Sequence, residues 1–361
     1  MYQVPNIAMW EDLISLPKPQ LKDICIDLGL SEKGSVDELC DRIWQHISPN
    51  SELQIQALGK SKEYLLGGKT SITWFTFDEE LTGLKNKIVE ELKEDIFNKM
   101  VVPSGESITA DPVIFSGAIG NSADEYYIRF IQRIGNTRNV YVNQISYRPR
   151  TATTTVYFDE RKKFLEVRAE PKRANKIAQS IARLLKQQIS MEQVKVAAPY
   201  GYSAERIADA LNGELFDAKA KPELLLENFN EEHAAAVVEI LRAIDNYFDN
   251  EDIGALSSSL ESTKEKFGEE YLKVPFAALI VNGLDKIGMG VSERDLRGMP
   301  FYDYFKPHLQ PQGGYIRFPQ VKDGLTTYHT IRIGLTTNSV QFVTPATESV
   351  IGYVRNCLVS I

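Results

Sequence analysis

Cysteine and histidine are both scarce in this chain of 361 residues. The three cysteines, Cys25, Cys40 and Cys357, form no CxxC pair and leave one thiol over. This pattern argues against a disulfide framework and against a zinc ribbon. Only four histidines are present, and they are scattered along the sequence. We therefore predict no metal and no cofactor.

Long apolar runs are also missing. No segment approaches the roughly 18 apolar residues that a membrane helix needs. The first residues, MYQVPNIAMWEDL, have neither the cationic start nor the apolar core of a signal peptide. We therefore expect a cytoplasmic protein without membrane contact. The apolar and charged fractions, 43% and 25%, are those of an ordinary globular protein, and the length suits two or three domains.

Acidic residues are scarce between Tyr126 and Lys195. That stretch holds 15 lysines and arginines against five acids, a balance of +10, whereas the whole chain carries −8. Concentrated cationic charge in an acidic protein favours a surface that binds a polyanion. The alternative is a protein surface as the partner, because residues 201–290, with 18 acids and eight cations, could dock on the same block.

Hydrophobic periodicity predicts how this block folds. Strands are expected over 112–119, 126–134 and 140–147, followed by a hairpin over 153–169. Amphipathic helices are expected over 79–100 and 172–189, and the acidic section predicts helices over 203–211, 231–248 and 256–267. Tyr126, Tyr147 and Tyr157 could pack in the sheet or stack on bases. The cations predicted to form one nucleic-acid surface are Arg129, Arg148 and Arg150 on strands, Arg161, Lys162 and Lys163 in the hairpin turn, and Lys172, Lys176, Arg183 and Lys186 on one face of the second helix.

Two short helices around a tight turn are predicted between Leu13 and Ile47. Apolar residues recur at helical spacing through Leu28, and Gly29 ends the first helix. Ser35, with Glu38 three residues later, predicts a capping box that opens the second helix.

The run Leu21-Lys22, Leu28-Gly29-Leu30, Gly34, Glu38-Leu39 and Arg42-Ile43 resembles the SAP motif, a helix-extended-helix DNA-binding module. The resemblance covers about residues 11–47. It implies that the start of the first helix, the glycine-containing loop and the start of the second helix face DNA phosphates. The corresponding positions in this sequence are Lys18, Lys22, Lys33, Gly34, Ser35 and Arg42.

The sequence departs from that motif in its charge. Ser35-Val36-Asp37 follows Gly34 where the family usually has a cation, and residues 1–50 balance to −4. Because phosphate neutralisation supplies most of such affinity, the helix pair alone would bind DNA weakly. A protein-docking helix pair of the same shape is the alternative.

The segment Phe164-Leu165-Glu166-Val167-Arg168 partly matches a nuclease pattern, in which an acid and an acid-x-Lys element hold a divalent ion. Asp159 and Glu166 could supply the acids, but Arg168 occupies the lysine position. An arginine stays protonated and cannot replace a tunable amine. A diverged metal-dependent nuclease is therefore the weakest alternative.

A short internal repeat relates two parts of the chain. Tyr315-Ile316-Arg317-Phe318 repeats Tyr127-Ile128-Arg129-Phe130, and a later strand leads through Pro171 or Pro345 into a helix in both places. Because the order of elements repeats as well, the pattern predicts a duplicated module.

Together these features predict an α+β fold in four parts: a SAP-like helical module at 1–50, a basic α+β domain at 64–198, an acidic and mainly helical section at 199–290, and a C-terminal α+β segment at 291–361. The predicted function is non-enzymatic binding of double-stranded DNA through its backbone, within a DNA-processing, regulatory or defence assembly. The alternative from another class is an interaction scaffold, in which the acidic 201–290 section and the basic face join copies of the chain or a partner protein.

Overall fold

The computed structural model describes residues 1–48, 50–77, 83–105, 107–142, 144–186, 190–222, 309–322 and 324–359, together with scattered positions between 235 and 297. The chain forms two compact units. Unit 1 comprises residues 1–213 and 316–361, and unit 2 comprises residues 214–315. The described residues combine helices with a large antiparallel sheet, so the predicted α+β class is confirmed.

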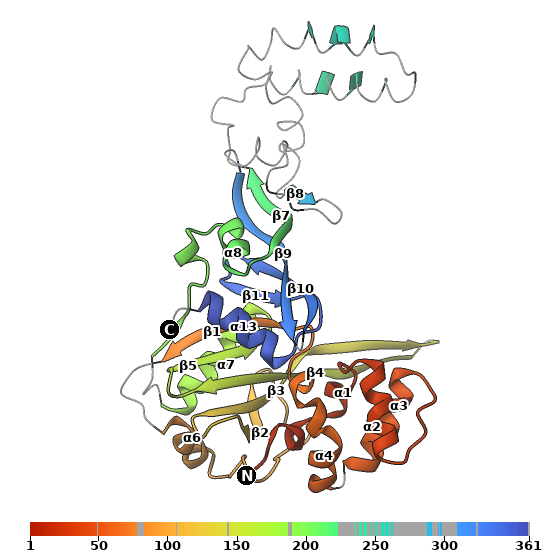
Figure 1. Ribbon diagram of the computed structural model, residues 1–361, viewed down its shortest axis with the longest axis vertical. Helices are drawn as coiled ribbons and strands as arrows, with labels where there is room; N and C mark the ends of the chain where they lie inside the picture. Colours follow the sequence, from red (N-terminus) through yellow and green to blue (C-terminus); the bar gives the residue numbers. More distant parts are fainter. Residues whose placement is uncertain are drawn as a thin grey trace. The chain divides into compact units, whose positions relative to one another are not determined.

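The described elements are named in chain order (Figure 1). The helical segments are η1 (Val4–Ile7), α1 (Trp10–Leu13), α2 (Lys18–Asp27), α3 (Val36–Ile47), α4 (Ser51–Leu58), η2 (Gly59–Ser61), α5 (Lys62–Leu65), α6 (Leu84–Leu92), α7 (Pro171–Leu184), η3 (Ala198–Tyr200), α8 (Ala204–Ala210) and α13 (Glu348–Leu358). The strands are β1 (Ser71–Phe77), β2 (Val113–Ile119), β3 (Glu125–Tyr141), β4 (Gln144–Asp159), β5 (Phe164–Arg168), β6 (Met191–Gln193), β7 (Glu214–Pro222), β8 (Ile287–Gly290), β9 (Leu309–Lys322), β10 (Leu325–Gly334) and β11 (Ser339–Phe342).

The sheet of unit 1 has the order β2-β3-β4-β5-β1-β11-β10-β9, and β6 also pairs with β1. The central strand is β1, which is antiparallel to both of its neighbours. Its first residues, Ser71 and Ile72, pair with β11, whereas Thr73 to Thr76 pair with β5. One strand therefore joins the two halves of the sheet.

Helices cover both faces of this sheet. On one side, which we call the α7 face, Tyr126, Ile128 and Phe130 of β3 pack with Ile177 and Ile181 of α7 and with side chains of α6. The alternate residues of β3 point to the opposite side, the α13 face. There the Tyr127 hydroxyl donates to Glu348 of α13, and Arg129 binds the N-terminal segment. The strands are buried between two helical layers, which accounts for their apolar character.

The two predicted N-terminal helices are confirmed as α2 and α3. Gly29 has φ +68°, and the amides of Gly29 and Leu30 donate to Ile26 and Cys25, which is a Schellman end. The capping box also forms, since Ser35 Oγ accepts from the Glu38 amide and Glu38 Oε2 accepts from the Ser35 amide. Both features stay local to the pair, and relationship to the SAP family remains a prediction.

Two helices are shorter than predicted. The helix expected over 79–100 is α6, which ends at Leu92 because Lys93 is left-handed and Asp95 then accepts from the Phe97 amide. The helix expected over 172–189 is α7, which ends at Leu184, two residues before the left-handed Lys186. The predicted helices over 231–248 and 256–267 fall largely outside the described residues.

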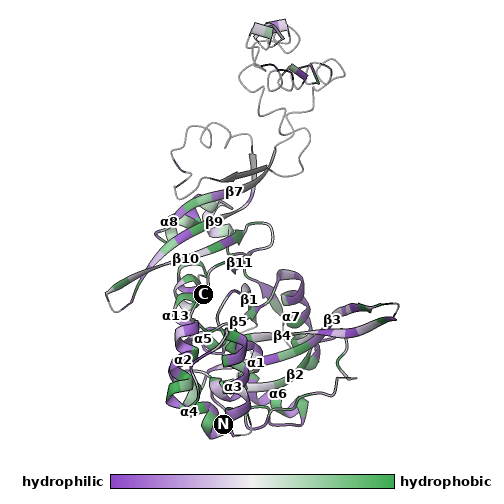
Figure 2. Cartoon of the chain, turned by 90° about the vertical axis from the view of Figure 1, so that its right-hand side faces the viewer, coloured by the Kyte–Doolittle hydropathy of each residue, from purple (hydrophilic) through white to green (hydrophobic). Residues whose placement is uncertain are grey.

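The main correction concerns β3 and β4. The strands expected over 126–134 and 140–147 are not separate, because β3 runs unbroken from Glu125 to Tyr141 and β4 pairs with it from Gln144 to Asp159. Gly135 interrupts the apolar pattern but lies at a bulge inside the strand, with φ +149°. The outer part of this hairpin, residues 133–151, extends past the neighbouring strands (Figures 1 and 2). We call it the arm.

The order of elements predicted from the internal repeat is present in the structure. Strands β3, β4 and β5 lead to α7, and strands β9, β10 and β11 lead to α13. The helix expected after Pro345 is α13, which runs from Glu348 to Leu358. In unit 2, β7 pairs antiparallel with β8, and the Phe216 and Tyr315 rings lie 6.1 Å apart. None of the helices in the described part of the chain is long and apolar enough to cross a membrane.

Candidate nucleic-acid interface

The arm concentrates exposed positive charge. Arg133, Arg138, Arg148 and Arg150 are all exposed on it, and no carboxylate occurs in the sequence from Tyr126 to Phe158. At the usual rise of a strand, the arm reaches about 25 Å from Arg133 to its tip. A two-stranded ribbon of this kind can enter a groove of double-stranded DNA.

The register of the arm separates its side chains onto two faces. Arg148 pairs with Thr137 and Arg150 with Gly135, so both arginines continue the α7 face of the sheet. The polar residues Asn139 and Ser146 are opposite each other on that same face. The other face carries the pairs Arg138–Tyr147 and Val140–Ile145. One side of the arm is therefore cationic and polar, and the other is largely apolar.

A groove of about 710 Å³ lies where the arm meets α7. Its lining includes four cationic side chains, Arg133, Lys172, Arg173 and Lys176, but only one carboxylate, Glu170. Gln132 and Gly135, which lie at the base of the arm's cationic face, also line it. The groove therefore continues the cationic track of Arg148 and Arg150 toward the first turn of α7.

The contacts inside the groove leave its charge incompletely neutralised. Lys176 Nζ donates to the Ala110 carbonyl at 2.6 Å and lies 3.7 Å from Asp111, while Arg173 lies 3.8 Å from Glu170. Arg173 Nε and the Oε1 of Gln132, a side chain only 6% exposed, have no hydrogen-bond partner among the described residues. The first amides of α7 add a partial positive charge at the same place. The arrangement suits an anionic ligand that also offers hydrogen-bonding groups.

The other predicted cations of this region lie elsewhere. Arg183 and Lys186 are near the far end of α7, roughly 20 Å from Lys172 by helical rise, and Lys186 pairs with Glu91 at 2.8 Å. The turn that carries Arg161, Lys162 and Lys163 follows β4 at Asp159, about 30 Å from Arg150 by strand rise. The predicted single surface is therefore divided into separate cationic regions. Arg148 and Arg150 lie on the arm, and Lys172 and Lys176 line the groove at its base.

Arg129 does not belong to any exposed surface. Its side chain is 2% exposed, forms a bidentate ion pair with Asp12, and donates to the Ile7 carbonyl at 2.8 Å. The prediction that it binds nucleic acid is wrong, because its guanidinium is used to hold the N-terminal segment against the sheet.

The six residues implied by the SAP resemblance have two kinds of environment. Lys18 and Lys33 are exposed and Lys22 is half-buried. Arg42 instead donates to the carbonyls of Ser31 and Lys33, and so holds the loop between the two helices.

Gly34 and Ser35 serve the start of α3. Gly34 has φ +138°, and a Cβ there would come within 2.6 Å of Glu38 Oε2, the oxygen that caps Ser35. Both residues therefore have a structural role at the start of α3.

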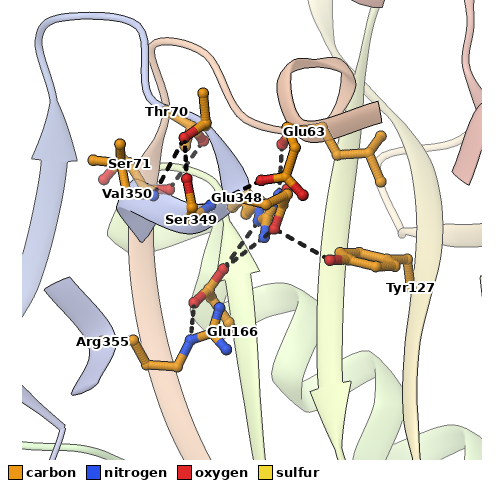
Figure 3. Close-up of polar contacts among 12 residues, drawn as sticks. Glu63, Thr70, Ser71, Tyr127, Glu166, Glu348, Ser349, Val350 and Arg355 are labelled. Carbon is orange, nitrogen blue, oxygen red and sulfur yellow. Dashed lines mark hydrogen bonds and ion pairs between the residues drawn. The ribbon is translucent and has the colours of Figure 1, made fainter. Parts of the chain in front are cut away.

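Glu166, the carboxylate of the nuclease alternative, is fully buried in an ion-pair network (Figure 3). One oxygen accepts from Arg168, and the other accepts from Trp74 and Arg355, each at 2.9 Å. Burial alone would raise the pKa of Glu166, but the charges of Arg355 and Arg168 and the Trp74 hydrogen bond hold it below the ordinary value.

Arg168 in turn forms a bidentate pair with Glu348. With both oxygens already bonded, Glu166 is not placed to act on a substrate. In the described part of the chain, no three His, Cys, Asp or Glu side chains gather as a metal site would require.

The surface predicted from the sequence does not include several residues of the arm and the groove. Arg138 and Arg173 belong to the cationic block but not to the predicted surface. Of the three candidate tyrosines, Tyr147 is the exposed one. Tyr126 instead stacks on Phe158 at 4.8 Å inside the core. The unbroken absence of acids from Tyr126 to Phe158 is the signal that could have identified the arm.

No protein-family model matches the chain, and no curated protein matches it at a significant level.

Proposed function

We propose that this protein binds double-stranded DNA through its phosphate backbone, with the arm and the groove at its base as the contact surface. The observation that carries the proposal is the arm itself, which presents four exposed arginines and lies within a run of 33 residues, Tyr126 to Phe158, that contains no carboxylate. A surface of one sign on a chain with net charge −8 attracts a ligand of opposite sign.

The expected binding is dominated by electrostatics. Six cations follow the proposed track, namely Arg148, Arg150, Arg133, Lys172, Arg173 and Lys176. If each neutralises one phosphate, the logarithm of the association constant falls with the logarithm of salt concentration at a slope of about −5. Such contacts position the protein without reading sequence.

The N-terminal helices add a second, weaker contact in this proposal. Lys18, Lys22 and Lys33 lie at the positions that the SAP resemblance implies. Deleting the module is a poor test, because removal of Asp12 would leave the buried Arg129 without its carboxylate. A triple Lys18→Ala, Lys22→Ala, Lys33→Ala variant tests the same contact and leaves the fold intact.

Fluorescence anisotropy with a labelled 30-base-pair duplex at several salt concentrations tests the proposal. We expect Arg148→Ala with Arg150→Ala to weaken binding at least tenfold and to reduce the salt slope by about two, one for each lost phosphate contact. The matched control is Arg161→Ala with Lys162→Ala, which removes the same charge from the distant turn and should change affinity less than threefold. Equal losses in the two pairs would show that net charge matters and the arm does not. No binding by the intact chain at low salt would refute the proposal.

A further inference from the structure

The tip of the arm is apolar, although it is among the most exposed parts of unit 1. Val140, Tyr141, Val142 and Ile145 are between 52% and 78% exposed. In the sequence, the two polar residues Asn143 and Gln144 stand between Val142 and Ile145. Scattered apolar residues are common on surfaces, but a cluster at the end of a projecting ribbon points to a contact.

The backbone of the tip gives a second observation. Val142 has φ +53° and is 78% exposed. Two-residue hairpin turns with positive φ favour Asn, Asp or Gly, whereas a β-branched residue is strained there. A valine that is both strained and exposed adds nothing to the stability of the turn. Backbone strain of this kind is characteristic of sites that contact a ligand.

We propose that this tip is a wedge that inserts between base pairs and kinks the duplex, with Val142 as the leading side chain. The inference rests on the proposed binding of DNA and adds a function to it, the bending of the bound duplex. Apolar side chains that enter a base step from the minor groove open the stacking and bend DNA by 20–90°.

The surroundings of the tip favour a base step over another apolar partner. Arg138 and Arg148 lie a few residues behind the tip on opposite faces of the ribbon, so cations flank the apolar end on both sides. The nearest carboxylates along the chain are Glu125 and Asp159, at the other end of the hairpin. This combination matches a duplex, in which phosphates flank apolar base faces. The combination matches an apolar surface of another protein less well, because the two arginines would have no partners of opposite charge there.

The test uses the full chain and two short duplexes. One is fully paired and the other has one central mismatch, and both carry 2-aminopurine beside the central position. A mismatched step is easier to open, so a wedge binds it more tightly and increases 2-aminopurine fluorescence by unstacking the base. We expect the intact chain to prefer the mismatched duplex about fivefold or more, and to bring the labelled ends of a longer duplex closer together in energy transfer.

The informative variant is Val142→Asn. Asparagine accepts the left-handed conformation, so this change relieves the turn while it removes the apolar wedge. We expect it to fold at least as stably, to retain the salt-dependent binding, and to lose both the mismatch preference and the fluorescence increase. The matched control is Leu325→Asn on the β9–β10 hairpin, where Leu325 is 72% exposed. That control should behave like the intact chain.

Three results would overturn the inference. The intact chain could bind both duplexes equally without a fluorescence change, which would leave backbone binding standing but remove the wedge. Val142→Asn could keep the mismatch preference. The intact chain could also be a dimer that Val142→Asn converts to a monomer without any effect on DNA, which would make the tip a contact between copies of this chain.

Discussion

Four charged side chains that are largely removed from water lie on the α13 face of unit 1. Glu166 and Arg168 are almost completely buried, and Glu348 and Arg355 lie at the edge of the same network. Two arginines balance two carboxylates, and the Tyr157 ring lies 4.4 Å from the Arg355 guanidinium. Burial of ions is tolerated only when each charge has a partner in good geometry. The network therefore stabilises the contact between β5 and α13 because every charge in it is paired, and no single pair supplies this effect alone.

We predict that Glu166→Gln strongly destabilises unit 1. The change removes the carboxylate that binds Arg168 and Arg355, and leaves a positive charge uncompensated in the interior. Loss of one partner of a buried pair costs about 3–5 kcal/mol, which a lower denaturant midpoint would report. Asp27→Asn is the matched control, since its pair with Lys60 is solvent-exposed, and we expect no measurable change. If the two variants were equally stable, the network would not support the fold.

The same carboxylate predicts how stability depends on pH. The folded-state pKa of Glu166 lies below its ordinary value of 4.5, so the unfolded chain binds a proton first as the pH falls. Its contribution to stability is complete above about pH 4.5 and is lost as the pH falls through the folded pKa. Between those two values the free energy of unfolding should fall by about 1.4 kcal/mol per pH unit from this group. Urea unfolding at pH 3 to 6 should show this loss in the intact chain and a flatter profile in Glu166→Gln.

At the scale of elements, the sequence was informative wherever the structure depends on near neighbours. Gly29, Ser35 and Glu38 were placed correctly because a helix end is determined by hydrogen bonds within a few residues. Arg129 was misassigned because its partner, Asp12, is 117 residues away in the chain. The partner of Glu166 in α13, Arg355, is 189 residues away. Neither pair produces a pattern in the local sequence. An arginine that is buried in an ion pair therefore cannot be distinguished in the sequence from an exposed one.

The arm shows the same limit for strands. Gly135 can end a strand or bulge inside one, and only the pairing of β3 with β4 decides between the two. Charge counting locates the basic block in the sequence but cannot show that folding separates Arg148 and Arg150 from Arg161 and Lys162. It also could not identify the groove, whose lining comes from β3, α7 and the segment before β2. A candidate interface therefore required the register of the strands.

At the scale of the whole molecule, the negative charge is concentrated in one unit. Residues 214–315 contain 19 acids and 10 cations, a balance of −9, so the residues of unit 1 carry +1 in total. Unit 1 is also continuous in space at the point where unit 2 is inserted. A Cβ on Gly213 would lie 2.8 Å from the carbonyl oxygen of Arg317 and 3.0 Å from Phe318 Cβ. The two connections can thus be joined by a short loop.

We therefore predict that replacing residues 214–315 with a short glycine-rich loop leaves unit 1 folded and strengthens its binding to DNA. Removal of nine net negative charges reduces long-range repulsion of a polyanion, so affinity at low ionic strength should rise several-fold. The gain should shrink as salt rises, because the Debye length falls to about 8 Å at 0.15 M and exposed charges are then screened. Anisotropy titrations at two salt concentrations measure the effect, and the shortened chain with Arg148→Ala and Arg150→Ala is the control. That control should lose the gain, because a less negative molecule still needs the arm to hold the duplex. A shortened chain that binds more weakly would instead show that unit 2 supplies DNA contacts of its own.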